Sequence, residues 1–208
     1  MNNEIMHQSP FTSNSSAASI ACVNKLVANS TPFIRINSLD RYEWCRVMEN
    51  PKDKRIGPWK YRAVYDVLSE KVWSQRGEVL YFVVDSMNKL RLVGQSANRL
   101  KDRWKPVPMF DSKTQASLGM RSLFHTSAWP AIEAGFSKDD KGQKQYTVSA
   151  IFRADLEREC RSIGGDLLSL LTVPETDHRR LSYRVEQWVC SLSNQGLALW
   201  NKQGVKRK

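Results

Sequence analysis

The chain has 208 residues, with 32 Lys and Arg against 21 Asp and Glu, which gives a formal net charge of +11. A hydrophobic fraction of 41%, including seven Trp and seven Phe, is enough for a folded core and excludes wholesale disorder and collagen-like scaffolds. No apolar run approaches the roughly 20 residues of a membrane-spanning helix, so we expect no membrane segment. The composition predicts an intracellular protein, cytoplasmic or nucleoid-associated, whose partners are polyanions, nucleic acid before anionic surfaces.

The positive charge is concentrated in two segments. Residues 89–105 hold six basic residues and one acid, and residues 202–208 hold four basic residues and no acid. Together they account for nine of the eleven excess charges, so the rest of the chain is nearly balanced. Six basic residues beside a turn are typical of a phosphate-binding surface, whereas we interpret residues 205–208 as a solvated basic tail.

The cysteines argue against a structural metal site. Cys22, Cys45, Cys160 and Cys190 form no C-x-x-C pair and have no histidine at ligand spacing, so zinc is not expected. The N-terminal sequence lacks the basic start and continuous apolar stretch of a secretion signal, which favours reduced cysteines. The sequence also lacks the common phosphate-binding glycine loops and hydrolase motifs.

In chain order, residues 1–30 are rich in Ser, Asn and Ala without periodicity, which predicts a flexible N-terminal arm. Residues 31–76 are predicted to form a helical extension, with a short helix over 38–50 and an amphipathic helix over 59–73. The residues that share the apolar face of the second helix are Tyr61, Tyr65, Leu68 and Val72.

Two strands follow, EVLYFVV (78–84) and KLRLVG (89–94), and the polar turn between them predicts an antiparallel hairpin. A basic helix capped by Ser96 or Asn98 comes next, and residues 105–145 are expected to be an irregular insertion with a short helix at 113–125. The pattern then predicts a strand at 146–152 and a helix at 153–163 that Gly164 and Gly165 end.

The last predicted helix starts at a capping box, Thr172 to Glu175, with a proline in its first turn. Its apolar stripe consists of Leu181, Val185, Trp188, Val189 and Leu192. Glu186 stands at the margin of this stripe.

A series of short motifs runs through residues 77–204. V-L-Y ends at Tyr81, L-V-G ends at Gly94, and G-Q-S-A-N leads into an arginine-rich stretch. A glutamate at 186 and W-N-K-Q-G at 200–204 complete the series. The order resembles the GIY-YIG nuclease superfamily, which carries two such tripeptides on a hairpin, then a helical arginine and a glutamate on a later helix. The resemblance implies an α+β fold: a small three-stranded antiparallel sheet flanked by helices, with the insertion at about 105–145 and an N-terminal helical extension.

Carried over residue by residue, the resemblance implies that Tyr81, Arg103 and Glu186 are catalytic, with Glu186 also holding Mg²⁺ or Mn²⁺. Arg99 is the alternative to Arg103, and Asn194 the alternative to Asn201 for the closing asparagine. The nucleic-acid-binding residues expected from the motifs and the charge pattern are Lys89, Arg91, Gln95, Asn98, Arg99, Lys101, Lys105 and Asn201.

Leu92 stands where the family has its second tyrosine. Either Tyr81 then acts with a neighbouring base, Lys89, Arg91 or His125, or catalysis is impaired. A phenol needs a nearby cation to become basic, and the basic residues around the hairpin supply that environment.

The implied chemistry is phosphodiester hydrolysis. A lone carboxylate can hold one Mg²⁺ that keeps several waters, and a guanidinium offers a planar fork to phosphate. We therefore expect a metal-dependent endonuclease of restriction or mobile-element type acting on double-stranded DNA. Such an enzyme, with one site per chain, cuts as a homodimer or cuts twice in sequence. The alternative is a nucleic-acid-binding module on the same scaffold without catalysis, and the third hypothesis is a basic interaction protein with no nucleic-acid role.

Overall fold

The computed structural model describes residues 13–45, 59–101, 106–111, 117–122, 145–172 and 180–201. Its centre is a sheet in which all the described strand pairs are antiparallel. The main sheet has five strands in the order β4-β3-β7-β1-β2, and a β5–β6 hairpin continues it from the end of β1. The strands are β1 (Thr31–Cys45), β2 (Trp59–Val67), β3 (Val79–Asp85), β4 (Leu90–Ser96), β5 (Pro106–Asp111), β6 (Ser117–Ser122) and β7 (Tyr146–Phe152).

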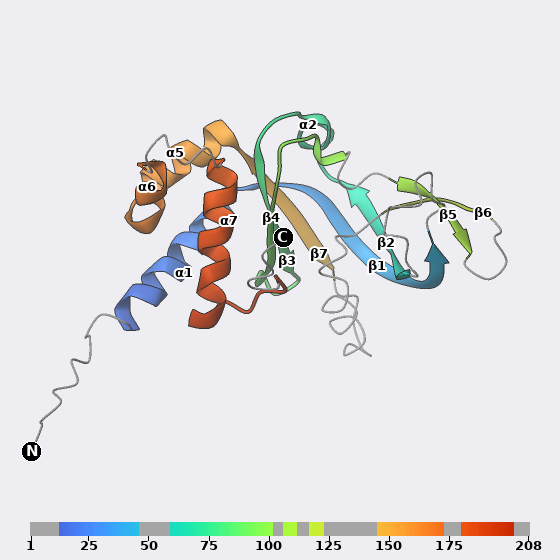
Figure 1. Cartoon of the computed structure of the whole chain (residues 1–208), viewed down its shortest axis with the longest axis horizontal. Coiled ribbons are helices and arrows are strands. Elements are labelled where there is room, and N and C mark those ends of the chain that lie inside the picture. Colours follow the sequence, from blue (N-terminus) through green and yellow to red (C-terminus); the bar gives the residue numbers. More distant parts are fainter. Residues whose placement is uncertain are drawn as a thin grey trace, which may run out of the picture.

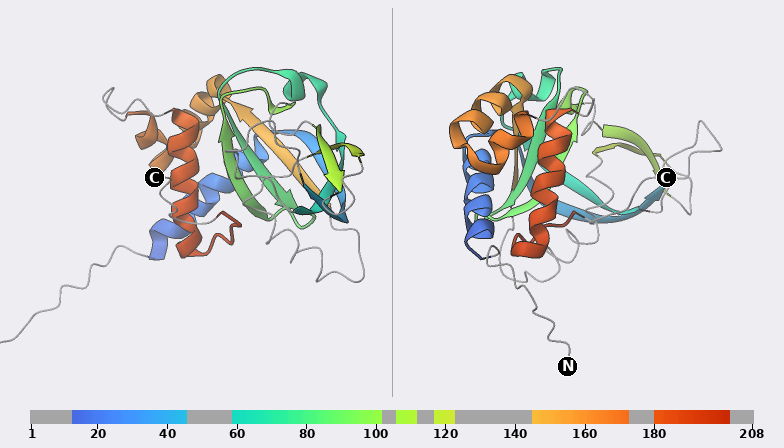
Figure 2. Two further views of the ribbon diagram at one scale, coloured as in Figure 1. Left: turned by 45° about the vertical axis from the view of Figure 1, so that its right-hand side comes forward. Right: turned by 60° about the vertical axis from the view of Figure 1, so that its left-hand side comes forward.

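The helices lie mainly on one side of this curled sheet, as Figures 1 and 2 show. The helices on that side are α1 (Ser13–Ala28), α5 (Arg153–Ile163), α6 (Gly165–Leu171) and α7 (Leu181–Ser191), which continues into the 3₁₀ turn η1 (Leu192–Gln195). The short helix α2 (Glu70–Ser74) stands apart from them, at the end of the sheet where β3 begins. The fold is α+β as expected, but the predicted three-stranded sheet is wrong, because β1 and β2 extend it.

Because side chains alternate along a strand, the sheet has two buried faces. The face under the helices, called the helical face here, holds Leu80 and Phe82 of β3 together with Leu181, Val185 and Val189 of α7. The opposite face, called the inner face, holds Tyr81, Val83 and Leu92 together with Phe33 and Tyr146. A side chain on β3 or β4 therefore belongs to one face or the other, and this decides which groups can meet.

The N-terminal segment is more ordered than its composition predicted. Residues 13–28 form α1, which buries Val23 and Leu26 on the helical face. Ser19 donates to Asp166 at 2.6 Å and Asn29 donates to Glu159 at 2.6 Å, so contacts with distant residues hold the helix in place. The prediction of a flexible arm is wrong for this part, since tertiary packing stabilises a helix that shows little periodicity of its own.

The predicted helical extension over 31–76 is wrong as well. The segments predicted as helices at 38–50 and 59–73 form the second half of β1 and all of β2 where they are described, and only α2 is helical. Tyr61 and Tyr65 are four residues apart, a spacing that fits one face of a helix and equally one face of a strand. The aromatic and β-branched residues of this segment favour the strand, and β1 supplies the partner.

The rest of the chain follows the prediction more closely. The β3–β4 hairpin, β7 and α5 are confirmed, and Gly164 ends α5 with a positive φ of 76°. The insertion contains strands β5 and β6, so a helix over 117–122 is wrong. Thr172 follows α6 instead of opening the last helix, which begins at Leu181, while residues 173–179 lie outside the described chain. The apolar stripe is confirmed through Leu181, Val185, Val189 and Leu192.

In the described part of the chain, no helix combines the length and the apolar character needed to cross a membrane.

Candidate nucleic-acid interface

Tyr81 is a core residue of the inner face. It pairs directly across the hairpin with Gly94, and only 1% of its surface is exposed. A Cβ added at Gly94 would lie 2.4 Å from both Cζ and Oη of Tyr81, so the ring lies flat against the glycine backbone. This is how an aromatic side chain covers a strand glycine that has no side chain of its own to pack. The two motif residues thus have a packing reason to occur together.

The structure does not bring Tyr81 and Glu186 together. Tyr81 points to the inner face, whereas Glu186 is on α7, whose buried residues all pack on the helical face. Tyr81 and the helix that carries Glu186 therefore pack on opposite faces of the sheet. Leu92 is 3% exposed and packs with Tyr81 on the inner face, and Arg103 lies outside the described residues.

Glu186 is half-buried. The described residues contain no cluster of three or more His, Cys, Asp or Glu side chains that could hold a metal ion. Burial and, to a lesser degree, the charge of Glu186 raise the pKa of Cys190 to about 11, so this thiol stays protonated. The three cysteines whose side chains are described, Cys22, Cys160 and Cys190, are not joined in disulfides.

Arg91, expected to bind nucleic acid, is bonded to the hairpin turn. Its guanidinium contacts Asp85 through Nε at 2.8 Å and through a terminal nitrogen at 2.7 Å. The other oxygen of Asp85 accepts from the backbone N–H groups of Met87 and Lys89, both at 2.9 Å. Burial alone would raise the pKa of Asp85, but these donors hold it below its ordinary value. Asp85 and Arg91 therefore fix the turn, and much of the charge of Arg91 is neutralised there.

Asn201, also expected to contact nucleic acid, covers the free edge of the sheet. β4 is an edge strand, and the Asn201 side chain accepts from Val93 N–H at 3.0 Å and donates to Val93 C=O at 2.8 Å. The Trp200 N–H donates to the Arg91 carbonyl at 2.6 Å, so the segment runs parallel to β4. One amide side chain thus replaces the two backbone partners that another strand would give Val93. Such covering prevents edge-to-edge association of sheets.

The other expected contacts differ in their surroundings. Lys89, Asn98 and Arg99 are exposed, Gln95 and Lys101 are half-buried, and Lys105 lies outside the described residues. The backbone N–H of Asn98 donates to Ser96 Oγ at 3.1 Å, which forms a local turn after β4. The segment that follows β4 lies at the end of the sheet where α2 lies, as Figures 1 and 2 show. Arg99 and Lys101 belong to this segment.

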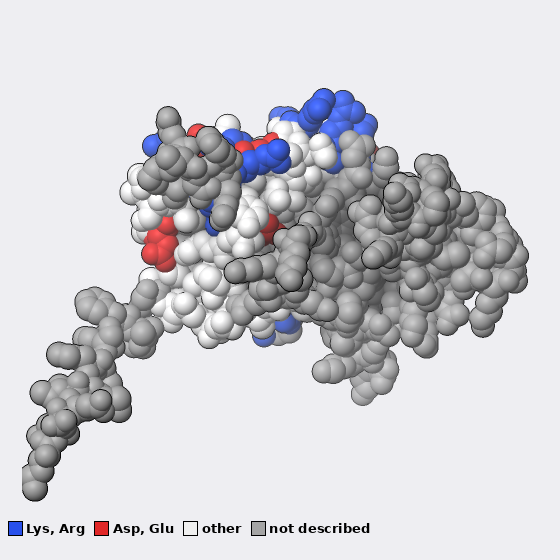
Figure 3. Space-filling model, in the orientation of Figure 1, with Lys and Arg blue, Asp and Glu red and all other residues white. Residues whose placement is uncertain are grey.

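The two segments at that end carry four basic residues, which we call the basic rim: Lys71, Arg76, Arg99 and Lys101. Val72 of α2 and Leu100 are buried in the same hydrophobic cluster, so both segments are anchored to the inner face. None of the four pairs with an acidic residue in the described chain, and Glu70 is the one acid within residues 70–76 and 97–101. Figure 3 shows Lys and Arg gathering over α2 without acidic neighbours on the visible face. The sequence analysis did not predict Lys71 and Arg76 as binding residues. They precede the basic segment 89–105, and only the fold brings α2 to the same end of the sheet.

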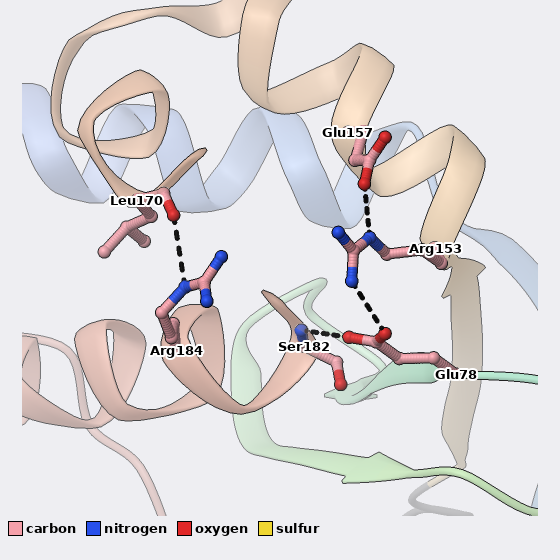
Figure 4. Close-up of polar contacts among 6 residues, drawn as sticks. All are labelled: Glu78, Arg153, Glu157, Leu170, Ser182 and Arg184. Atoms are coloured by element: carbon pink, nitrogen blue, oxygen red, sulfur yellow. Dashed lines mark hydrogen bonds and ion pairs between the residues drawn. The ribbon is translucent and has the colours of Figure 1, made fainter. Parts of the chain in front are cut away.

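A neighbouring region has mixed charges that are paired. Arg153 donates to Glu78 at 3.0 Å and also to Glu157, and Glu78 accepts from the Ser182 backbone N–H at 2.7 Å (Figure 4). Burial alone would raise the pKa of Glu78, but the Ser182 N–H and Arg153 hold it below its ordinary value. Glu78 thus supplies the acceptor at the start of α7 that the local sequence lacks. Arg184 donates to the Leu170 carbonyl at 3.1 Å and joins α7 to α6.

Comparison with known proteins adds no relationship: no protein-family model matches the chain, and neither a curated protein nor a solved structure is significantly similar to it. The resemblance to GIY-YIG nucleases therefore rests on the motif residues alone.

Proposed function

We propose that this protein binds nucleic acid through the basic rim. The observation that carries the proposal is that the segments of Lys71 and Arg76 and of Arg99 and Lys101 lie at one end of the sheet, and that these four residues have no acidic partner in the described chain. Unpaired cations on one surface attract phosphates and release condensed counterions on binding.

We do not extend the proposal to DNA cleavage. Tyr81 is buried against Gly94, and Glu186 stands on the other side of the sheet. The nucleic-acid-binding module without catalysis fits this geometry better than the Mg²⁺-dependent endonuclease. Incubation of plasmid DNA with Mg²⁺ or EDTA reports on the enzyme directly: cleavage that EDTA and Glu186→Gln both abolish would reinstate it.

The test of binding compares two variants with the same loss of charge. In the rim variant Lys71, Arg76, Arg99 and Lys101 are changed to Gln. In the dispersed variant the changed residues are exposed ones elsewhere: Lys25, Lys89, Arg158 and Arg161. Fluorescence anisotropy with a labelled oligonucleotide, between about 50 and 200 mM salt, gives the affinity and its salt dependence.

We expect the rim variant to bind much more weakly. The slope of log K against log salt should become shallower by about 0.9 for each phosphate contact removed from a duplex. The dispersed variant should keep most of the affinity of the wild type. Equal losses in both variants would mean that diffuse charge, and not the rim, attracts the ligand, and a wild type without affinity would refute the proposal.

A further inference from the structure

An aromatic cluster lies within the basic rim. Trp73 is on α2, two residues after Lys71 and three before Arg76. Its ring centroid is 6.3 Å from that of Phe33 and 5.9 Å from that of Tyr65, which belongs to β2. Phe33 is fully buried, whereas Trp73 and Tyr65 are each only half-buried. The cluster therefore has a core side and a surface side, and the exposed cations Lys71 and Arg76 stand close to Trp73 in the sequence, on α2 and just after it.

Trp73 is held rigidly for so short a helix. Ser69 accepts from the Val72 N–H at 3.4 Å and caps the helix, and the Ser69 carbonyl accepts from the Trp73 N–H at 2.9 Å. The Leu68 and Ser69 N–H groups both donate to the carbonyl of Phe33, which ties the start of α2 to β1. A ring fixed in this way loses little conformational freedom when it binds a flat partner.

The surface beside the cluster is also apolar. Leu68, immediately before the cap of α2, is 41% exposed and is one of three large hydrophobic side chains exposed in the described chain. An apolar and aromatic surface among cations is complementary to a ligand that carries both flat rings and negative charges. Nucleic-acid bases have this character only where they are unpaired, because a duplex stacks and pairs its bases inside.

We propose that the basic rim takes single-stranded nucleic acid, with a base stacked on Trp73 beside Tyr65 and the adjacent phosphates on Lys71 and Arg76. This inference rests on the proposed function and specifies its ligand. Stacking explains why an aromatic ring stays half-exposed in a segment that also carries two exposed cations. If the three rings only consolidated the core, they would give no preference between single-stranded and double-stranded ligands.

The test measures affinity for single-stranded and duplex oligonucleotides of equal length, about 12 nucleotides per strand, at one salt concentration. The wild type should prefer the single strand. Trp73→Leu should lower single-strand affinity about ten-fold and leave duplex affinity unchanged, whereas Trp73→Phe, which keeps a ring, should retain most of it. Trp188→Leu on α7, also half-buried but distant from the rim, is the matched control and should change neither affinity.

A second measurement guards against misfolding of Trp73→Leu. Ultraviolet cross-linking of the wild-type protein to a single strand containing 5-iodouracil should label Trp73 or Tyr65. Labels confined to other residues, or equal affinities that do not respond to Trp73→Leu, would overturn the inference while leaving binding at the rim intact. Absence of binding to either ligand would instead remove the proposed function itself.

Discussion

In the β3–β4 hairpin, the polar side chains are bonded to the fold itself. Arg91 contacts Asp85, and Asn201 contacts the backbone of Val93. At the basic rim, beyond the other end of the same strands, Lys71 and Arg99 have no acidic partner in the described chain. Both regions are basic in the sequence, yet one uses its charge and amide groups to hold the hairpin together. The comparison shows that a basic side chain indicates a binding surface only where it forms no ion pair or hydrogen bond within the fold.

The largest expected effect on the hairpin side of this comparison comes from Gly94→Ala. The added Cβ would lie 2.4 Å from the Tyr81 ring, which is fully buried and has little room to move. We expect the free energy of unfolding to fall by about 3 kcal/mol, measured by chemical denaturation. In a Tyr81→Leu background the distal ring atoms are gone, so the same substitution should cost much less. An equal cost in both backgrounds would contradict the proposed packing of Tyr81 on Gly94.

The next largest effect on stability is expected at Glu78, which forms an ion pair with Arg153. Glu78→Gln should lower stability at neutral pH by about 2 kcal/mol, because it weakens the bonds to Ser182 and Arg153. The lowered pKa of Glu78 means that its stabilisation is complete above its ordinary pKa of about 4.5 and is lost as the pH falls through the folded value. The variant should therefore show a flatter loss of stability in acid, recorded by denaturation at several pH values. Glu70→Gln, at an exposed site, is the control, and a flattening as large there would contradict this role.

The smallest expected effect comes from Asn201→Ala. Val93 would lose both bonds of its side-chain partner, but water can reach this edge, so we expect a cost of about 1 kcal/mol. The exposed edge should also promote association, which size-exclusion chromatography detects. Asn194→Ala, at an exposed asparagine of η1, should change neither property. Nucleic-acid affinity of the Asn201 variant should match the wild type, and a large loss would return Asn201 to the binding surface.

The sequence predicted the structure correctly where the local secondary-structure preference agrees with the packing of the segment in the fold. Alternation and a polar turn predicted the β3–β4 hairpin, and a regular apolar stripe predicted α7 from Leu181 onward. It was misleading at β2, because residues four apart fit a helix face and a strand face equally. Only the position of β1 beside this segment decides between the two.

The candidate site shows the same division. Arg99 and Lys101 were predicted from local charge, but Lys71 and Trp73 reach the same surface only through the fold. The motif residues Tyr81 and Gly94 occur together for a packing reason that spacing alone does not reveal. Residue types at given intervals therefore cannot separate a pair that packs from a pair that reacts, because both require proximity across a hairpin.

The most direct test of the central claim is lysine footprinting of the wild-type protein with and without a bound oligonucleotide. Acetylation of Lys71 and Lys101 in the rim is compared with that of Lys25 on α1 and Lys89 in the hairpin turn. If nucleic acid occupies the basic rim, Lys71 and Lys101 become protected while Lys25 and Lys89 keep their reactivity. Protection of Lys89 with unchanged reactivity at Lys71 and Lys101 would place the ligand on the hairpin and contradict the account.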